Sequence, residues 1–217
     1  MKAMTTLPAA GKSDPCPRTL NTMLNNAVKP VIGITAWSGT GKTTLLQSLI
    51  PLFRQHGVRV AVIKHSHHKF DVDKPGKDSY NIRKAGAAQT IVASGKRMAL
   101  MIDYEEELQE PSLNDVLAWL RQDQIDLILV EGFKHDPSFE KIELWREAVG
   151  KSLSHPDDSS IIAVASDSAA VETENLPLLD LNSAPQICDF IMQRLNLLSA
   201  RCRGADTCCH FDPREKS

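Results

Sequence analysis

The stretch Ala36-Trp37-Ser38-Gly39-Thr40-Gly41-Lys42-Thr43 decides the fold of this chain. It matches the phosphate-loop pattern G-x-x-x-x-G-K-[ST], with Ala36 in place of the first glycine. An apolar run of strand type at 31–35 precedes it, and a segment with leucines at helical spacing at 43–55 follows it. A strand that aims a glycine-rich loop at the start of a helix is the arrangement that cradles phosphate groups.

Each position of this loop has an expected contact with a nucleoside triphosphate. The backbone amides of residues 39–41, with Ser38 beside them, are expected to hold the β-phosphate. Lys42 is expected to bridge the β- and γ-phosphates, Thr43 to bind Mg²⁺ through its hydroxyl, and Thr44 to reach the α-phosphate. The alternative is a glycine-rich turn with a solvated lysine, and the order of strand, loop and helix disfavours it.

Apolar strands alternate with helices along the rest of the chain. Strands are expected at 31–35, 58–63, 89–93, 98–102, 125–130, 142–145 and 161–165, and helices at 43–55, 80–85, after Ser112, and at 185–198. This order predicts an α/β fold of the P-loop NTPase type, with three layers and a mostly parallel sheet flanked by helices. Pro51 predicts a kink in the first helix, because proline cannot donate to the preceding turn.

The 217 residues fit one domain with tails. Residues 1–29 lack a sustained period and are expected to form a flexible leader, and the polar stretch 201–217 a flexible tail. A nucleotide-binding domain is expected between them, at 30–200. No apolar run is long enough to span a membrane, and the N-terminal residues do not resemble a signal peptide, so we expect a cytoplasmic protein.

The cysteines agree with a reducing compartment. Their number is odd, and three of them fall in the last 16 residues, so they do not form a disulfide framework. They are Cys16, Cys188, Cys202, Cys208 and Cys209. The last three stand beside His210 without the spacing of a zinc finger, and an unstructured tail is favoured over a zinc site.

The net charge of −2 divides unevenly along the chain. Residues 31–100 contain 11 Lys/Arg against 3 Asp/Glu, a balance of +8, and residues 101–200 contain 6 against 20, a balance of −14. The half that contains the phosphate loop is therefore the half that attracts anions. Nucleic-acid binding is disfavoured, because aromatic residues make up only 5% of the chain and do not alternate with the basic residues.

An acidic partner for the loop is expected at the end of a buried strand, where a carboxylate can hold Mg²⁺. Glu131 follows the apolar run 125–130, and Gly132 allows the backbone to pass close to the phosphates. The alternative, that any strand ends in a polar residue, is weakened by the phosphate loop. No Asn-Lys-x-Asp signature is present, so guanine specificity does not follow from the residues. Asp167 is the candidate for reading the base, with an exposed loop aspartate as the alternative.

The polar stretch 64–79 contributes much of the positive charge. Because it follows a strand, it is expected on the side where α/β sheets bind ligands, and Lys64 and His65 are candidates for holding a second anionic group. Three carboxylates of the stretch are candidates for ordering Mg²⁺: Asp71, Asp73 and Asp78. Two alternatives remain open, a Zn²⁺ or Ni²⁺ site built from His65, His67 and His68, and a solvated polar loop.

Four segments together resemble the MobB family, the molybdopterin-guanine dinucleotide biosynthesis adapter proteins. They are ITAWSGTGKTTLL, VIKHSHHKFDVDKPGKDSYNIRKAGA, DLILVEGFKH and IIAVASD. The resemblance runs from about residue 31 to about residue 198. It implies a homodimeric GTP-binding protein with weak GTPase activity, which works beside the nucleotidyltransferase MobA to attach GMP to molybdopterin. On this resemblance Lys42 and Thr43 hold GTP and Mg²⁺, and Lys42 and Glu131 are the candidate catalytic residues.

Two other functions compete with this one. The same fold suits a small-molecule kinase or ligase whose acceptor is held by the basic stretch. The histidine cluster suits a metal-delivery protein that uses GTP as a switch.

Overall fold

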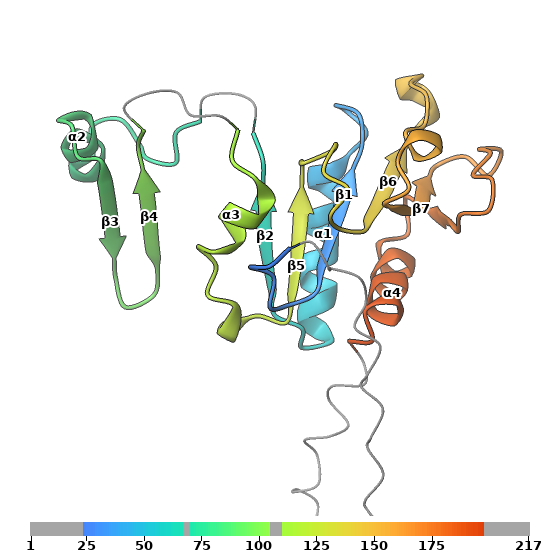
Figure 1. The fold of residues 1–217 in the computed structure, drawn as a ribbon, viewed down its shortest axis with the longest axis horizontal. Helices are drawn as coiled ribbons and strands as arrows, with labels where there is room; N and C mark the ends of the chain where they lie inside the picture. Colours follow the sequence, from blue (N-terminus) through green and yellow to red (C-terminus); the bar gives the residue numbers. More distant parts are fainter. Residues whose placement is uncertain (1–23, 67–69, 105–109, 198–217) are drawn as a thin grey trace, which may run out of the picture.

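The computed structural model describes residues 24–66, 70–104 and 110–197. Its main sheet has six strands in the order β2-β5-β1-β6-β7-β8, and every neighbouring pair is parallel (Figure 1). The strands are β1 Val31–Thr35, β2 Val60–Lys64, β5 Leu127–Glu131, β6 Lys141–Trp145, β7 Ile161–Ser166 and β8 Leu178–Asp180. The predicted α/β fold with a mostly parallel sheet is confirmed.

Helices cover both faces of this sheet. On one face α1 (Lys42–Gln55) and α4 (Ala184–Arg194) pack over Ile32 and Ile34. On the other, the short helix α3 (Leu113–Leu117) packs over Val31 and its neighbours on β5. Successive β1 residues therefore enter different cores, as a central strand requires. Helix α1 continues as one helix through Pro51.

Residues 24–29, which their composition groups with the leader, pack against α3. Leu24 is buried in the core between α3 and the sheet, which we call the second core. The backbone amide and the side-chain amide of Asn26 donate to Asn114 at 3.0 Å and 2.8 Å. The packed part of the chain therefore includes these six residues, and the rest of the expected leader and tail lies outside the described residues.

The strands at 89–93 and 98–102 do not join the main sheet. They are β3 (Gln89–Ala93) and β4 (Met98–Ile102), which pair only with each other and antiparallel. Four residues connect them, a length that links antiparallel neighbours and is too short for a parallel crossover. Together with α2 (Asp78–Lys84) they stand apart from the main sheet (Figure 1). We call these three elements the hairpin unit.

Smaller elements complete the fold. In the part of the chain that the structure describes, three 3₁₀ helices occur, at Gln122–Gln124, Glu147–Val149 and His155–Asp157. No helix among the described residues is both long and apolar enough to cross a bilayer.

Candidate functional site

The phosphate loop joins β1 to α1 at the carboxyl edge of the sheet. Gly39 and Gly41 have φ angles of 83° and 107°, a region that glycine adopts without steric cost. Helix α1 begins directly after Gly41, with no side-chain cap and no acidic residue in its first turn. Its first amide groups and the positive end of its dipole are thus not neutralised by a side chain of that turn, which suits an anion. Thr43 and Thr44 lie exposed in the same turn.

Lys42 folds back over the loop. Its ammonium group donates to the carbonyl oxygens of Ala36 and Trp37 at 3.0 Å and 3.2 Å. Burial lowers the pKa of Lys42, the charge of Glu131 opposes this, and the charges of Lys64 and Lys134 add to the lowering. Several charged groups of the site therefore lie close to Lys42.

Glu131 is the last residue of β5 and reaches the same edge of the sheet. It lies opposite Ile34 of β1 on one side and opposite Lys64 of β2 on the other. Glu131 is only 8% exposed, and the Lys64 ammonium group donates to its Oε1 at 3.0 Å. The structure therefore brings Glu131 and Lys64 together beside the strand that leads into the loop.

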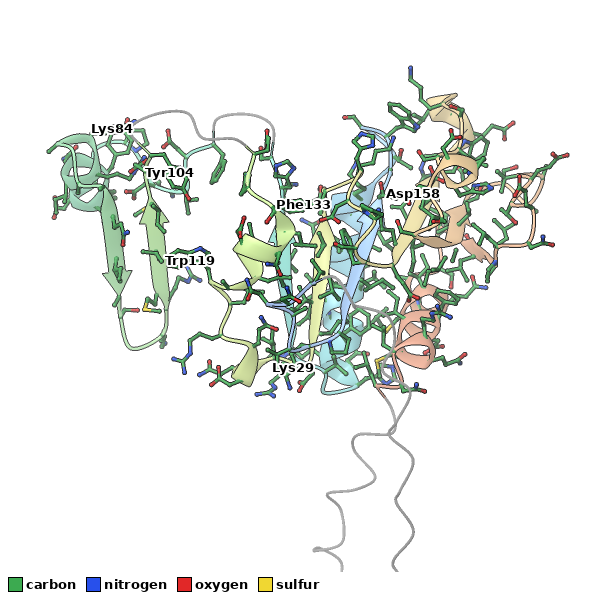
Figure 2. The ribbon with its side chains drawn as sticks, viewed as in Figure 1. Lys29, Lys84, Tyr104, Trp119, Phe133 and Asp158 are labelled. Atoms are coloured by element: carbon green, nitrogen blue, oxygen red, sulfur yellow. The ribbon has the colours of Figure 1, made fainter. Side chains whose placement is uncertain are left out.

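The backbone turns sharply after Glu131. Gly132 has a φ angle of 107°, and a Cβ atom there would lie 2.6 Å from the Cβ of His65. Phe133 follows with a φ angle of 51°, and its ring stacks on His65 at 4.5 Å between centroids. Figure 2 shows Phe133 at the carboxyl end of the sheet. The Nε2 atom of His65 also forms a hydrogen bond with the carboxylate of Glu110. His65 therefore supports this turn from the β2 side.

Lys134 contacts Trp37, a residue of the phosphate loop. The Lys134 ammonium group lies 3.8 Å from the centroid of the Trp37 ring, and that of Lys151 lies 5.8 Å from it. The indole N–H of Trp37 donates to the carbonyl oxygen of Ser152 at 3.0 Å. Sequence reasoning missed Lys134, although its position three residues after the acidic strand end was a signal.

Arg146 is a second residue that sequence reasoning missed. Its Nε donates to the carbonyl oxygen of Thr40 at 3.2 Å, and its Nη1 donates to Asp167 at 3.1 Å. The backbone amide of Glu147 donates to the other oxygen of Asp167 at 3.2 Å. Arg146 directly follows β6, so its place at the carboxyl edge was the signal that could have found it.

Two carboxylates of the polar stretch 64–79 bind residues of α2, in the hairpin unit. Asp71 pairs with Arg83 at 2.6 Å, and Asp73 accepts from the Ser79 hydroxyl at 2.9 Å. Asp78 is the first residue of α2, and Figure 1 places α2 away from β1 and the phosphate loop. The structure does not bring Asp78 together with Thr43 and Glu131.

The proposed metal sites fall largely outside the described residues. His67 and His68 are not described, nor are Cys202, Cys208 and Cys209. Within the described part of the chain, no group of three or more His, Cys, Asp or Glu side chains is arranged to hold a metal ion.

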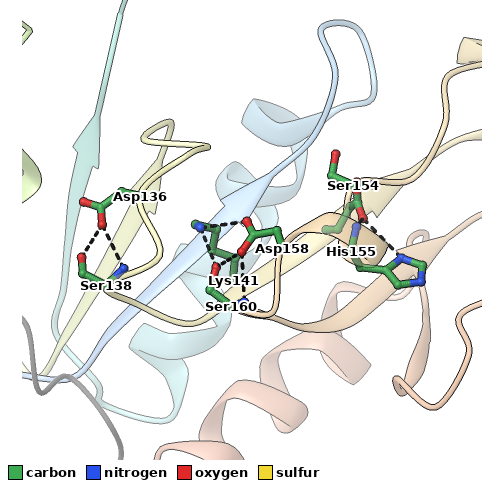
Figure 3. Close-up of polar contacts among 8 residues, drawn as sticks. Asp136, Ser138, Lys141, Ser154, His155, Asp158 and Ser160 are labelled. Carbon is green, nitrogen blue, oxygen red and sulfur yellow. Dashed lines mark hydrogen bonds and ion pairs between the residues drawn. The ribbon is translucent and has the colours of Figure 1, made fainter.

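Buried polar side chains of β6, the neighbour of β1 on the side away from β5, bind the loops that follow this strand (Figure 3). The Lys141 side chain is fully buried, and its ammonium group donates to Asp158 at 3.1 Å and to the Ser160 hydroxyl at 2.6 Å. Glu143 accepts from the backbone amides of Ser154 and His155 at 2.7 Å and 3.0 Å. These contacts hold the loops that follow β6 against the sheet.

Comparisons with known proteins point to one family. The family model described as "MobB: Molybdopterin guanine dinucleotide synthesis protein B" matches residues 31–167. A molybdopterin-guanine dinucleotide biosynthesis adapter protein of Escherichia coli K12 is 46% identical over 175 residues, which cover 79% of this chain and 96% of that protein. One of the same name from Haemophilus influenzae is 44% identical over 168 residues, or 77% of this chain and 90% of that protein.

Solved structures share the fold. A crystal structure of molybdopterin-guanine biosynthesis protein B (mobB) aligns with a TM-score of 0.56 and 26% identity over 75% of this chain and 98% of that one. A crystal structure of Bacillus subtilis MobB aligns with a TM-score of 0.57 and 22% identity over 76% of this chain and 98% of that one.

Proposed function

The chain belongs to the MobB family, and on that premise we propose that it is a GTP-binding adapter of molybdenum-cofactor biosynthesis. In this role it assists a MobA-type nucleotidyltransferase in attaching GMP to molybdopterin, in the cytoplasm. The observation that carries the proposal is the phosphate loop, which follows the strand that pairs with Glu131 and leads into a helix whose first amide groups have no side-chain cap.

The residues of the site fit a nucleoside triphosphate with Mg²⁺. A Cβ atom at Gly39 would have no neighbour within 4 Å, so the loop is open where a phosphate would approach. Thr43 and Glu131 would hold Mg²⁺, with the Thr43 hydroxyl and a buried carboxylate as hard oxygen ligands. When bound, Mg²⁺ offsets the charge of the β- and γ-phosphates.

The chain's own residues then bind and orient the nucleotide. The amides at the start of α1 hold the β-phosphate, and Lys42 exchanges its contacts with the Ala36 and Trp37 carbonyls for phosphate oxygens. Lys64 donates to one oxygen of Glu131, so Lys64 and Mg²⁺ would compete for this carboxylate. This competition is consistent with slow hydrolysis and a mainly accessory role.

We further propose that the protein is a homodimer that forms through the hairpin unit. Ile91 lies opposite Leu100, and Met98 is two residues from Leu100 on the same face of the hairpin. These three side chains are 62%, 40% and 64% exposed. A two-stranded sheet is not stable by itself and needs a covered apolar face, which a second copy of the hairpin unit can supply.

Calorimetry with the full chain tests the nucleotide proposal. We expect the wild-type protein to bind GTP with Mg²⁺ more tightly than ATP, and Lys42→Ala to abolish binding. Lys96→Ala, which removes a lysine from the exposed hairpin turn, is the matched control and should bind like the wild type. Unchanged GTP affinity in Lys42→Ala would overturn the proposal.

Co-purification with a MobA-type transferase tests the adapter role. We expect the two proteins to associate and the yield of guanylylated molybdopterin to rise when both are present. If the protein binds GTP but neither associates with the transferase nor raises the yield, the adapter role is overturned and nucleotide binding stands.

A further inference from the structure

We propose that Lys134 makes this site select a triphosphate over a diphosphate, by contacting the terminal phosphate with its ammonium group. The proposal rests on nucleotide binding at the phosphate loop and adds a residue that the motif does not contain.

The backbone turns sharply just before Lys134, and the Lys134 side chain reaches Trp37 of the phosphate loop. Gly132 and Phe133 are consecutive left-handed residues, with φ angles of 107° and 51°. Glycine adopts this region freely, but phenylalanine rarely does. Phe133 is held there by the stacked ring of His65 and by the second core, against which it packs. The chain thus maintains an unfavourable backbone conformation immediately before Lys134, as is typical of functional sites.

Trp37 holds two ammonium groups at once. Its carbonyl oxygen accepts from Lys42 at 3.2 Å, and its ring lies 3.8 Å from the ammonium group of Lys134. Among the residues that the structure describes, no carboxylate pairs with Lys134. Two cations held around one residue repel each other, and an anion bound between them would remove that repulsion.

The position of Lys134 favours the terminal phosphate. The loop runs from Trp37 at its start to the first turn of α1, where Thr44 is expected to meet the α-phosphate. Lys134 reaches the opposite end of this path, next to Trp37 and three residues after Glu131. The phosphate farthest from Thr44 is the terminal one.

The contact with Trp37 is of a kind that a phosphate can replace. A cation over a partly exposed ring is held weakly, whereas an ammonium group on a phosphate oxygen forms a charge-assisted hydrogen bond. Because lysine has a flexible stem, the head group can move from the ring to the phosphate while the backbone stays in place.

Calorimetry on two nucleotides tests the proposal. The ligands are GDP and a non-hydrolysable GTP analogue, each with Mg²⁺, and the variants are Lys134→Met and Lys134→Arg. We expect Lys134→Met to bind the analogue about tenfold more weakly and GDP unchanged, because one charge-assisted contact is lost. Lys134→Arg should retain most of the selectivity. Lys151→Met, which removes the more distant lysine near the same ring, is the control and should match the wild type.

The outcomes separate this proposal from nucleotide binding itself. Unchanged GDP affinity shows that Lys134→Met is folded. A ratio of the two affinities that stays within about twofold of the wild-type ratio overturns the role of Lys134, whether or not both affinities fall. A wild-type protein that binds neither ligand overturns nucleotide binding at the loop.

Discussion

The guanidinium group of Arg146 donates to the carboxylate of Asp167 at 3.1 Å, and the same group donates to the carbonyl oxygen of Thr40 in the phosphate loop at 3.2 Å. The loop after β7 is thereby tied to the loop after β1. Asp167 also accepts from the amide of Glu147, so both of its oxygens already have protein partners. This arrangement suits an aspartate that positions Arg146, whereas the sequence suggested one that reads the base.

We predict that Asp167→Ala weakens GTP and ATP binding by a similar factor, about tenfold, because a hydrogen bond to a charged group near the phosphates is lost. Competition calorimetry with the two nucleotides measures both affinities. Glu172→Ala, which removes an exposed carboxylate from the same loop, is the control. A loss confined to GTP would show instead that Asp167 contacts guanine.

Gly132→Ala should destabilise the protein by about 2–4 kcal/mol, because the new Cβ adds a close contact with His65 to the cost of a left-handed backbone. Gly150→Ala provides the matched control. Gly150 has a φ angle of 63° but nothing within 4 Å of its Cβ position, so only the backbone cost of about 1 kcal/mol applies. Urea unfolding measures both values. Equal losses would show that the approach of His65 relaxes without cost.

The pair formed by the buried Lys141 and the partly exposed Asp158 predicts a stability that depends on pH. Burial is the largest influence and raises the pKa of Asp158, but hydrogen bonds from Ser160 and Lys141 together outweigh it and hold the pKa below its ordinary value of 3.8. A carboxyl whose pKa is lower in the folded chain than in the unfolded chain stabilises the fold above the unfolded-state pKa. That contribution is lost as the pH falls through the folded-state pKa.

Asp158→Ala should therefore cost about 3 kcal/mol at pH 7, because it leaves the Lys141 ammonium group buried without its carboxylate. The difference from the wild type should shrink below about pH 4. Lys141→Met is expected to cost less, because Asp158 is 22% exposed and can turn to water. Urea unfolding between pH 3 and pH 7 gives these values. A pH-independent difference for Asp158→Ala would contradict the charged pair.

The double substitution Ile91→Glu with Leu100→Glu should convert a dimer into a monomer, because it places paired charges on the apolar face of the hairpin unit. Sedimentation equilibrium measures the mass, and calorimetry checks that GTP is still bound. Val28→Glu, at an exposed position outside the hairpin unit, should leave the dimer intact. A wild-type monomer, or a dimer that survives the double substitution, would rule out this interface.

The bounds of several elements were predictable from the sequence, those on either side of the phosphate loop among them. The strand before the loop was predicted with its observed bounds, and the helix after it to within one residue, because an apolar run, a glycine-rich turn and leucines at helical spacing are strong local signals. Glu131 was predicted just after its strand and is instead the last strand residue.

Features that depend on distant contacts were not predictable in this way. Strand β8 has only three residues and follows Pro177, so it carries no measurable alternation. The two strands of the hairpin unit were predicted with their observed bounds, but their separation from the main sheet was not, since residue pattern alone does not say which strands pair. Arg146 and Lys134 belong to the site only because the sheet order brings the ends of β6 and β5 to either side of β1.

The place of β1 in the sheet also sets when the site can form during synthesis. Both neighbours of β1 come late in the chain: its hydrogen-bonded partners begin at Ile128 and Lys141, about a hundred residues after Val31. At about 5–20 residues per second, a ribosome needs about 5–20 s to make that stretch. Throughout that interval the nascent chain contains the complete phosphate loop, but the two strands that pair with β1 have not yet been made. Folding of the site therefore waits for long-range parallel pairing between β1 and these two late strands.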